Sequence, residues 1–223
     1  MTSRAWRLLL AAAAAAVLPA GALPATAQTA GACTATFNGI PADQIASISR
    51  PLLLGAGDAL TFAGADLETT QNAAVVVHLG PASLGRAAAP PGLAQTNFSV
   101  SLPLSEVAPY GVGLLHIRGT TDNCTVDAWL RLGGRLPFTT LVGLTGTGLA
   151  LAGLTGQISA LVARRRWSVP LAAAAGVATG VGGAFLGQQF GRLQLSYPAL
   201  AACIALAVLV GLGLALLLRR RGS

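Results

Sequence analysis

Residues 139–166 read TTLVGLTGTGLALAGLTGQISALVARRR, an uncharged apolar run of 25 residues that ends in three arginines. Two more runs follow, because residues 168–190 carry no charge over 23 positions and residues 197–218 none over 22. Each run exceeds the roughly 20 residues that a helix needs to cross a bilayer core. The sequence therefore predicts three transmembrane helices, at 138–163, 168–190 and 197–218.

The arginines predict how these helices are oriented. All 14 basic residues are Arg, and no Asp or Glu follows Arg135. Two clusters close the first and third apolar runs, and the positive-inside rule places both in the cytoplasm. The loop 164–167 and the tail 219–223 are then cytoplasmic, the loop 191–196 is external, and the chain is a multi-pass protein of the plasma membrane. The residues expected to fix this topology are Arg164, Arg165, Arg166, Arg219, Arg220 and Arg221.

The N-terminus predicts export. Arg4 and Arg7 precede the apolar stretch 8–18, and Ala25-Thr26-Ala27 matches the small-residue pattern at which secretory signal peptides are cut. Residues 1–27 are therefore expected to be a signal peptide. The alternative is an uncleaved signal anchor, and in both cases the segment that follows is exported.

The exported segment, 28–137, is expected to form the folded domain. It holds five arginines and all seven acidic residues of the chain, and hence a formal charge of −2. A basic nucleic-acid surface is excluded on such a domain, although the whole chain has a pI near 11.

Short alternating stretches in this segment predict strands. Apolar and polar residues alternate over 33–38, 97–102 and 124–131, and further strands are expected near 59–62, 73–79 and 112–118. Six or seven short strands in about 110 residues are typical of an all-β sandwich. Both faces of 112–118 are partly apolar, so its register stays open.

Cys33 and Cys124 are expected to form a disulfide. They are the only cysteines outside the apolar runs, they occupy the apolar faces of the first and last predicted strands, and an exported domain permits the bond. Two free buried thiols are the alternative. Cys203 lies in the third apolar run and is expected to be a packing residue.

Part of the domain resembles the immunoglobulin-like repeats of actinobacterial surface proteins. The stretches that carry the resemblance are Gly57-Asp58-Ala59-Leu60-Thr61-Phe62-Ala63-Gly64, Ala74 to Leu79, Leu84-Gly85, Asn97-Phe98-Ser99-Val100, and Leu104 to Tyr110 followed by Leu114 to Gly119. The resemblance implies an Ig-like fold on a cell surface and no activity. The expected fold is thus an all-β Ig-like sandwich ectodomain followed by a three-helix transmembrane region.

Such surface proteins often end in a Leu-Pro-x-Thr-Gly sorting signal, an apolar span and a basic tail. Residues 136–140 here read LPFTT, followed by the first apolar run and Arg164 to Arg166. The fifth residue is Thr140 instead of Gly, and two further apolar runs follow. Pro137 is instead expected to separate the last strand from the first helix.

Small residues recur every fourth position in the second and third runs, as they do where helices pack closely. One explanation is docking on a partner membrane protein or a second copy, and the other is packing among the three helices themselves. The residues concerned are Gly176, Gly180, Gly183, Gly187, Ala207 and Gly211.

No motif predicts catalysis, a metal or a cofactor. The two histidines, His78 and His116, are expected to be strand residues that face solvent or pack under a loop. Asp66 and Glu68 are expected on a solvated face. Gln188 and Gln189, at the end of the second run, are expected to meet the membrane interface.

The predicted function is that of a membrane-anchored, exported surface protein with a non-catalytic interaction domain. The alternative is an accessory subunit of a larger plasma-membrane complex that docks through the small-residue helix faces. The expected partners are membrane lipid and a membrane or cell-envelope protein. The segment 80–95 is expected to be an apolar loop that either contacts such a partner or folds onto its own domain.

Overall fold

A computed structural model describes residues 33–90, 95–162 and 168–221 of the chain, and the predicted signal peptide lies outside these residues. The described residues divide into two compact units. The β unit contains residues up to Val142 together with Gln188–Gln194, and the helix unit contains Gly143–Gly187 and the residues from Leu195 onward.

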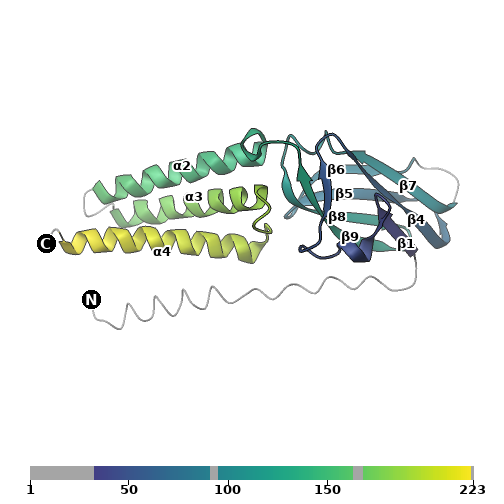
Figure 1. The fold of residues 1–223 in the computed structure, drawn as a ribbon. Coiled ribbons are helices and arrows are strands. Elements are labelled where there is room, and N and C mark those ends of the chain that lie inside the picture. Colours follow the sequence, from purple (N-terminus) through teal and green to yellow (C-terminus); the bar gives the residue numbers. More distant parts are fainter. Residues whose placement is uncertain (1–32, 91–94, 163–167, 222–223) are drawn as a thin grey trace. The chain divides into compact units, whose positions relative to one another are not determined.

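In the described part of the β unit, nine strands form two sheets (Figure 1). The first sheet has the order β2-β1-β4-β7 and the second the order β3-β9-β8-β5-β6. A short helix, η1 (Ala42–Ile45), follows β2, and a second, η2 (Pro137–Thr139), precedes the first long helix. The strands are β1 (Cys33–Phe37), β2 (Ile40–Pro41), β3 (Leu52–Gly55), β4 (Ala59–Thr70), β5 (Ala73–Leu79), β6 (Ala82–Ala88), β7 (Gln95–Pro103), β8 (Gly113–Thr121) and β9 (Thr125–Gly133).

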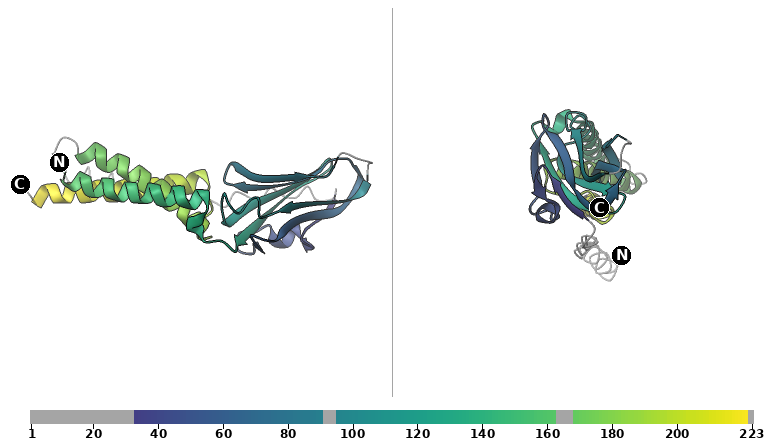
Figure 2. Two further views of the ribbon diagram at one scale, coloured as in Figure 1. Left: turned by 90° about the horizontal axis from the view of Figure 1, so that it is seen from above. Right: turned by 90° about the vertical axis from the view of Figure 1, so that its right-hand side faces the viewer.

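The two sheets pack face to face through alternating apolar residues (Figure 2). Phe62 of β4 lies at the centre of this core and contacts the rings of Phe37 and Phe98, with centroids 5.2 and 4.9 Å away. On the opposing sheet Gly119 of β8 leaves the room for Phe62, because a Cβ at Gly119 would collide with that ring. Each buried phenylalanine stabilises the fold by about 1.5–3 kcal/mol.

The expected all-β Ig-like sandwich is wrong as a fold class. The second sheet is mixed, since β3 runs parallel to β9 with Leu52 opposite Leu130. The three long helices also contain more residues than the nine strands together, so the chain is a mixed α and β protein. The alternation of the sequence located most strands, but it carries no information on which strands pair or in which direction.

Three of the strands, β2, β3 and β6, are not expected from the sequence. The segment 80–95 was expected to be an apolar loop, yet Ala82–Ala88 pairs with β5 at the sheet edge. Small side chains such as Ala82, Gly85 and Ala87 hide the alternation that marks a strand. The register between these two strands shifts between Val77 and His78.

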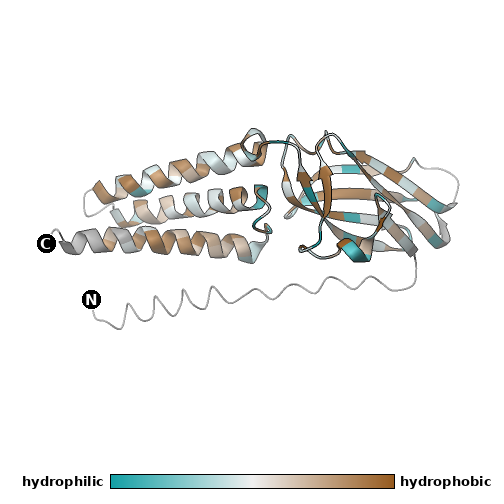
Figure 3. Ribbon diagram, in the orientation of Figure 1, coloured by the Kyte–Doolittle hydropathy of each residue, from teal (hydrophilic) through white to brown (hydrophobic). Residues whose placement is uncertain are grey.

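The helix unit is built from α2 (Leu141–Val162), α3 (Ser168–Gln189) and α4 (Tyr197–Arg221). Both α2 and α3 are long and apolar enough to cross a membrane, by length and composition, and Figure 3 shows few hydrophilic residues along them. The described apolar part of α4, Tyr197–Gly213, is shorter. The structure thus gives two helices that could span a bilayer.

Several of the small residues let the three helices approach one another within the chain. A Cβ at Gly180 would lie 2.5 Å from the Ile204 Cα of α4, and one at Gly176 would lie 2.6 Å from the Val208 Cα. Gly211 of α4 faces Ala172 of α3 and Gln157 of α2. Gly183 is exposed, and a Cβ there would meet nothing within 4 Å. Gly187 and Ala207 are half-buried in α3 and α4.

These glycines supply a matched pair of substitutions in one helix. Gly180→Ala is expected to lower the thermal melting point of the purified chain in detergent, because overpacking of this kind costs about 1–3 kcal/mol. Gly183→Ala is expected to leave it unchanged or raise it, since Ala favours a helix over Gly by up to about 1 kcal/mol. Circular dichroism melting curves measure both. Equal effects of the two variants would contradict the packing of Gly180 against α4.

Candidate interaction face and the buried glutamine pair

The outer face of the five-stranded sheet carries a row of three rings. Strand β8 buries Leu115 and Ile117, so His116 between them points outward. Its neighbours across the sheet are His78 of β5 and Trp129 of β9. The ring centroids of His116 lie 6.0 Å from those of His78 and 5.1 Å from those of Trp129. Side chains from three strands thus form one surface.

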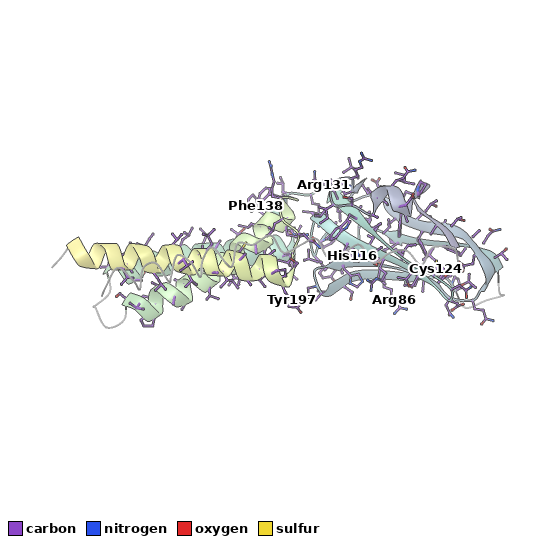
Figure 4. The ribbon with its side chains drawn as sticks, turned by 90° about the horizontal axis from the view of Figure 1, so that it is seen from below. Arg86, His116, Cys124, Arg131, Phe138 and Tyr197 are labelled. Carbon is purple, nitrogen blue, oxygen red and sulfur yellow. The ribbon has the colours of Figure 1, made fainter. Side chains whose placement is uncertain are left out.

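A carboxylate beside these rings binds two basic side chains. The Nε atom of Arg118 donates to Asp127 Oδ1 at 2.7 Å, and His116 Nε2 lies 3.2 Å from the same oxygen. Arg118 Nη2 donates to Asp127 Oδ2 at 3.4 Å. His78, His116, Arg118, Asp127 and Trp129 are named the outer-face cluster below, and Figure 4 labels His116 within it.

Proton equilibria in the cluster follow from these contacts. The hydrogen bond from His116, and then the one from Arg118, hold the pKa of Asp127 well below its usual range. The bond to Asp127 raises the pKa of Arg118. Burial lowers the pKa of His78, and the nearby charges of His116 and Arg118 lower it further. The cluster therefore presents a fixed ion pair next to a neutral imidazole at neutral pH.

The cluster is suited to binding through stacking and hydrogen bonds. Arg118 is about half exposed, with a relative side-chain exposure of 47%, and can reach a ligand. Within the described ranges no three His, Cys, Asp or Glu side chains come close enough together to hold a metal ion. The expected positions of His78 and His116 in strands, half-buried at the surface, are what the structure shows.

Asp66 departs from the sequence prediction. Because β4 continues to Thr70, Asp66 follows Leu60 and Phe62 on the inward face, and its side chain is buried. Neither carboxylate oxygen has a hydrogen-bond partner among the described residues. The expected solvated face is therefore wrong for Asp66, and the side chain of Glu68 lies outside the described residues.

Two of the other predicted groups are only partly described. Cys124 is disulfide-bonded and Cys203 is free. The backbone of Cys33 is in β1, but its side chain lies outside the described residues, so its pairing with Cys124 stays a prediction. Arg164 to Arg166 also lie outside them. Arg219 to Arg221 end α4, and their side chains are not described.

A buried pair of glutamines is the feature that the sequence prediction missed. Gln188 and Gln189 end α3, yet they belong to the β unit and are 0% and 2% exposed. Gln189 Oε1 accepts from the backbone N–H of Val112 at 2.9 Å and lies 2.9 Å from Thr140 Oγ1. The expectation that they meet the membrane interface did not foresee these contacts, because both side chains are buried by protein.

Gln188, the other member of the pair, binds the beginning of β8. Gln188 Nε2 donates to the Leu114 carbonyl at 2.6 Å, and Gln189 Nε2 donates to Gln188 Oε1 at 2.6 Å. The register between β5 and β8 starts only at His116, so these amides supply hydrogen bonds where β5 does not. The sequence signal was the pair itself, because two adjacent amides at the end of an apolar run need partners.

The residues after Gln189 make further contacts within the β unit. Arg131 Nη2 of β9 donates to the Gly191 carbonyl at 3.1 Å, and Phe138 and Phe190 pack edge to face with centroids 5.6 Å apart. The backbone N–H of Leu141, the first residue of α2, donates to the Pro109 carbonyl at 2.9 Å. The start of α2 and the end of α3 are therefore both built into the β unit.

Gln189→Leu is expected to destabilise the β unit. The substitution leaves the Val112 N–H and Gln188 Oε1 without their partner, and a buried unpaired polar group costs about 1–3 kcal/mol. Thermal melting of the whole chain in detergent measures the loss. Gln194→Leu is the matched control, because Gln194 is exposed in the same segment. A melting point of Gln189→Leu equal to that of Gln194→Leu would rule out the structural role.

Asp127→Asn is expected to change both the titration of His78 and the pH dependence of stability. The charge of Asp127 raises the pKa of His78, whereas burial, His116 and Arg118 lower it, so the substitution is expected to lower the His78 titration midpoint further. NMR titration can follow this midpoint separately, because the chain has two histidines. The pKa of Asp127 is lowered by folding, so its stabilising contribution, about 1 kcal/mol for a partly solvated pair, exists at neutral pH and fades in acid. The variant should therefore be less stable than the wild type at neutral pH, with a difference that shrinks as the pH falls.

Asp43→Asn is the control for this experiment, because Asp43 is an exposed carboxylate in η1. It should leave the His78 midpoint in place. An upward shift of that midpoint in Asp127→Asn would show that Asp127 does not act on His78 as described.

No protein-family model matches this chain, and no curated protein matches it. The function proposed for it therefore rests on its own residues and their geometry.

Proposed function

We propose that this chain is a membrane-anchored protein whose β unit is held outside the cytoplasm and acts by binding, not by catalysis. The outer-face cluster is the proposed binding face. The observation that carries the proposal is that Gln188–Gln194, the segment between α3 and α4, folds as part of the β unit.

This segment supports a particular path of the chain through the bilayer. The start of α2 and the end of α3 both lie in the β unit, so two helices that cross the membrane must leave it and return to it. Helix α4 then begins at Tyr197, shortly after the same segment, and a third crossing takes the C-terminus to the opposite side. Three crossings with the β unit on one side are thus consistent with the way the chain is folded.

The composition of the helices supports the same path. In the most apolar 18-residue stretch of each helix, 17% of α2 and 33% of α3 is buried inside the protein. Most side chains in these stretches therefore face outward. Neither helix contains an Asp, Glu or Arg residue. Arginines follow each of the ends that would be cytoplasmic, as the positive-inside rule requires.

Binding by the β unit is supported by the arrangement of the outer-face cluster. Its ion pair is already formed, and its half-buried rings come from three neighbouring strands and contact one another. A ligand therefore meets groups that need little further ordering, which lowers the entropic cost of association.

The alternative, an accessory subunit that docks through small-residue helix faces, has less support. Gly176 and Gly180 already face the backbone of α4, so they are not free to receive a partner helix. Purification in mild detergent separates the two functions. A membrane protein that remains bound in stoichiometric amounts would favour the accessory subunit.

Cysteine labelling on intact cells tests the topology. In a Cys203→Ala background, Gln194→Cys is expected to react with a membrane-impermeant maleimide, because Gln194 is exposed in the segment of the β unit. Ala163→Cys and Ser223→Cys are expected to react only after permeabilisation. Labelling of either of these two from outside, or protection of Gln194→Cys in intact cells, would overturn the proposed orientation.

A further inference from the structure

The β unit leaves a patch of large apolar side chains exposed next to the glutamine pair. Leu136 is 69% exposed, Phe138 48% and Phe190 52%, and Tyr110 and Leu141 are also exposed. These five residues are named the aromatic patch. Figure 4 labels Phe138, which lies in η2 between the last strand and α2.

Short contacts tie the members of the patch together. The rings of Phe138 and Phe190 pack edge to face, and the N–H of Val142 donates to the Tyr110 carbonyl at 3.0 Å. Thr139, between Phe138 and the buried Thr140, donates from its hydroxyl to the Leu136 carbonyl at 2.8 Å. These contacts fix Phe138 against Phe190 and Tyr110 against the start of α2, within the same loops that hold Gln189.

The rest of the β unit treats its phenylalanines differently. Phe37, Phe62 and Phe98 of the sheets are all buried. A half-exposed phenylalanine forgoes part of the free energy that its burial would contribute. Two phenylalanines and two leucines exposed in one place therefore indicate that something apolar covers them.

The charged residues around the patch indicate which kind of surface covers it. Arg135 and Arg192 are exposed beside Leu136 and Phe190, while Arg131 is engaged with Gly191. No acidic residue follows Arg135 in the sequence. Aromatic rings with flanking basic residues at the ends of apolar helices are the composition of a membrane interface. The binding site of a partner protein would have no reason to lie at the ends of the apolar helices.

We infer that the aromatic patch lies in the headgroup layer of the membrane and that Arg135 and Arg192 bind the phosphates of anionic phospholipids there. The inference rests on the proposed function. It adds the depth of the patch and the class of lipid that the protein prefers. Tyr110 supplies an amphipathic ring, and Leu136, Phe138, Leu141 and Phe190 supply apolar area toward the acyl chains.

Fluorescence quenching tests the depth. The full chain, with Trp6→Phe, Trp129→Phe and Trp167→Phe, is reconstituted in vesicles, and Phe138→Trp or Phe190→Trp reports the patch. Lipids brominated near the headgroup end of the acyl chain are expected to quench both tryptophans more than lipids brominated deep in the chain. Asn97→Trp, at an exposed site on β7, is the control and should be quenched by neither. Quenching of the patch no greater than that of Asn97→Trp, or strongest from the deep bromines, overturns the inference.

Spin-labelled lipids test the choice of headgroup. The association constant of phosphatidylglycerol relative to phosphatidylcholine is expected to fall about fivefold at these sites for each arginine replaced in Arg135→Gln and Arg192→Gln. Arg86→Gln, an exposed arginine on β6, is the matched control and should not change it. Equal selectivity in the patch variants and the control shows that the arginines do not bind anionic lipid.

Alkaline carbonate extraction separates this inference from the proposed function. A chain that stays in the membrane pellet but shows no quenching at Phe138→Trp keeps its anchor and loses the inferred patch. A chain released by carbonate has no membrane-spanning anchor, and the proposed function fails with it.

Discussion

The hydrogen bonds of Gln188 and Gln189 are the constraint on which the arrangement of the β unit depends. Buried backbone groups must be paired, and the first residues of β8 extend beyond the register that β5 shares with it. Two side-chain amides from the end of α3 bind Val112 and Leu114 in place of a strand. Gln189 Oε1, which binds the Val112 N–H, also accepts a hydrogen bond from Thr140 just before α2 begins. The glutamine pair thus joins the end of α3, the start of β8 and the residue before α2, which are far apart in the sequence.

The close fit at this point also explains the glycine that starts β8. Gly113 has a φ of +87°, a conformation that side chains rarely adopt. A Cβ there would collide with the Gln188 carbonyl and lie 2.6 Å from that of Gln189. The chain therefore needs glycine for its backbone angle and for space alike. The resulting contact buries both amides, which makes their hydrogen bonds costly to lose, since no water can replace a missing partner.

Much of the local structure could be predicted from the sequence, because alternation and apolar length are local properties. The strand expected at 73–79 is β5, and the apolar runs at 168–190 and 197–218 coincide closely with α3 and α4. Pairing is not local, so the parallel contact of β3 with β9 and the burial of Asp66 on a lengthened β4 could not be predicted. In β8, whose register stayed open, His116 and Arg118 face outward, and the glutamines bind the backbone around Leu114. The outer-face cluster needs the alignment of β5, β8 and β9, which the positions of His78 and His116 alone do not give.

The outer-face cluster already contains an ion pair that a charged ligand would have to break. In the outer-face cluster Arg118 already binds Asp127, and a ligand carboxylate that takes Arg118 must leave Asp127 with His116 alone. Such an exchange gains little energy, because one charged contact replaces another. The rings of His78, His116 and Trp129 pack against one another, with centroids 6.0 and 5.1 Å apart, and His116 is also paired with Asp127. The Asp127 carboxylate therefore holds both Arg118 and His116 in place on this face.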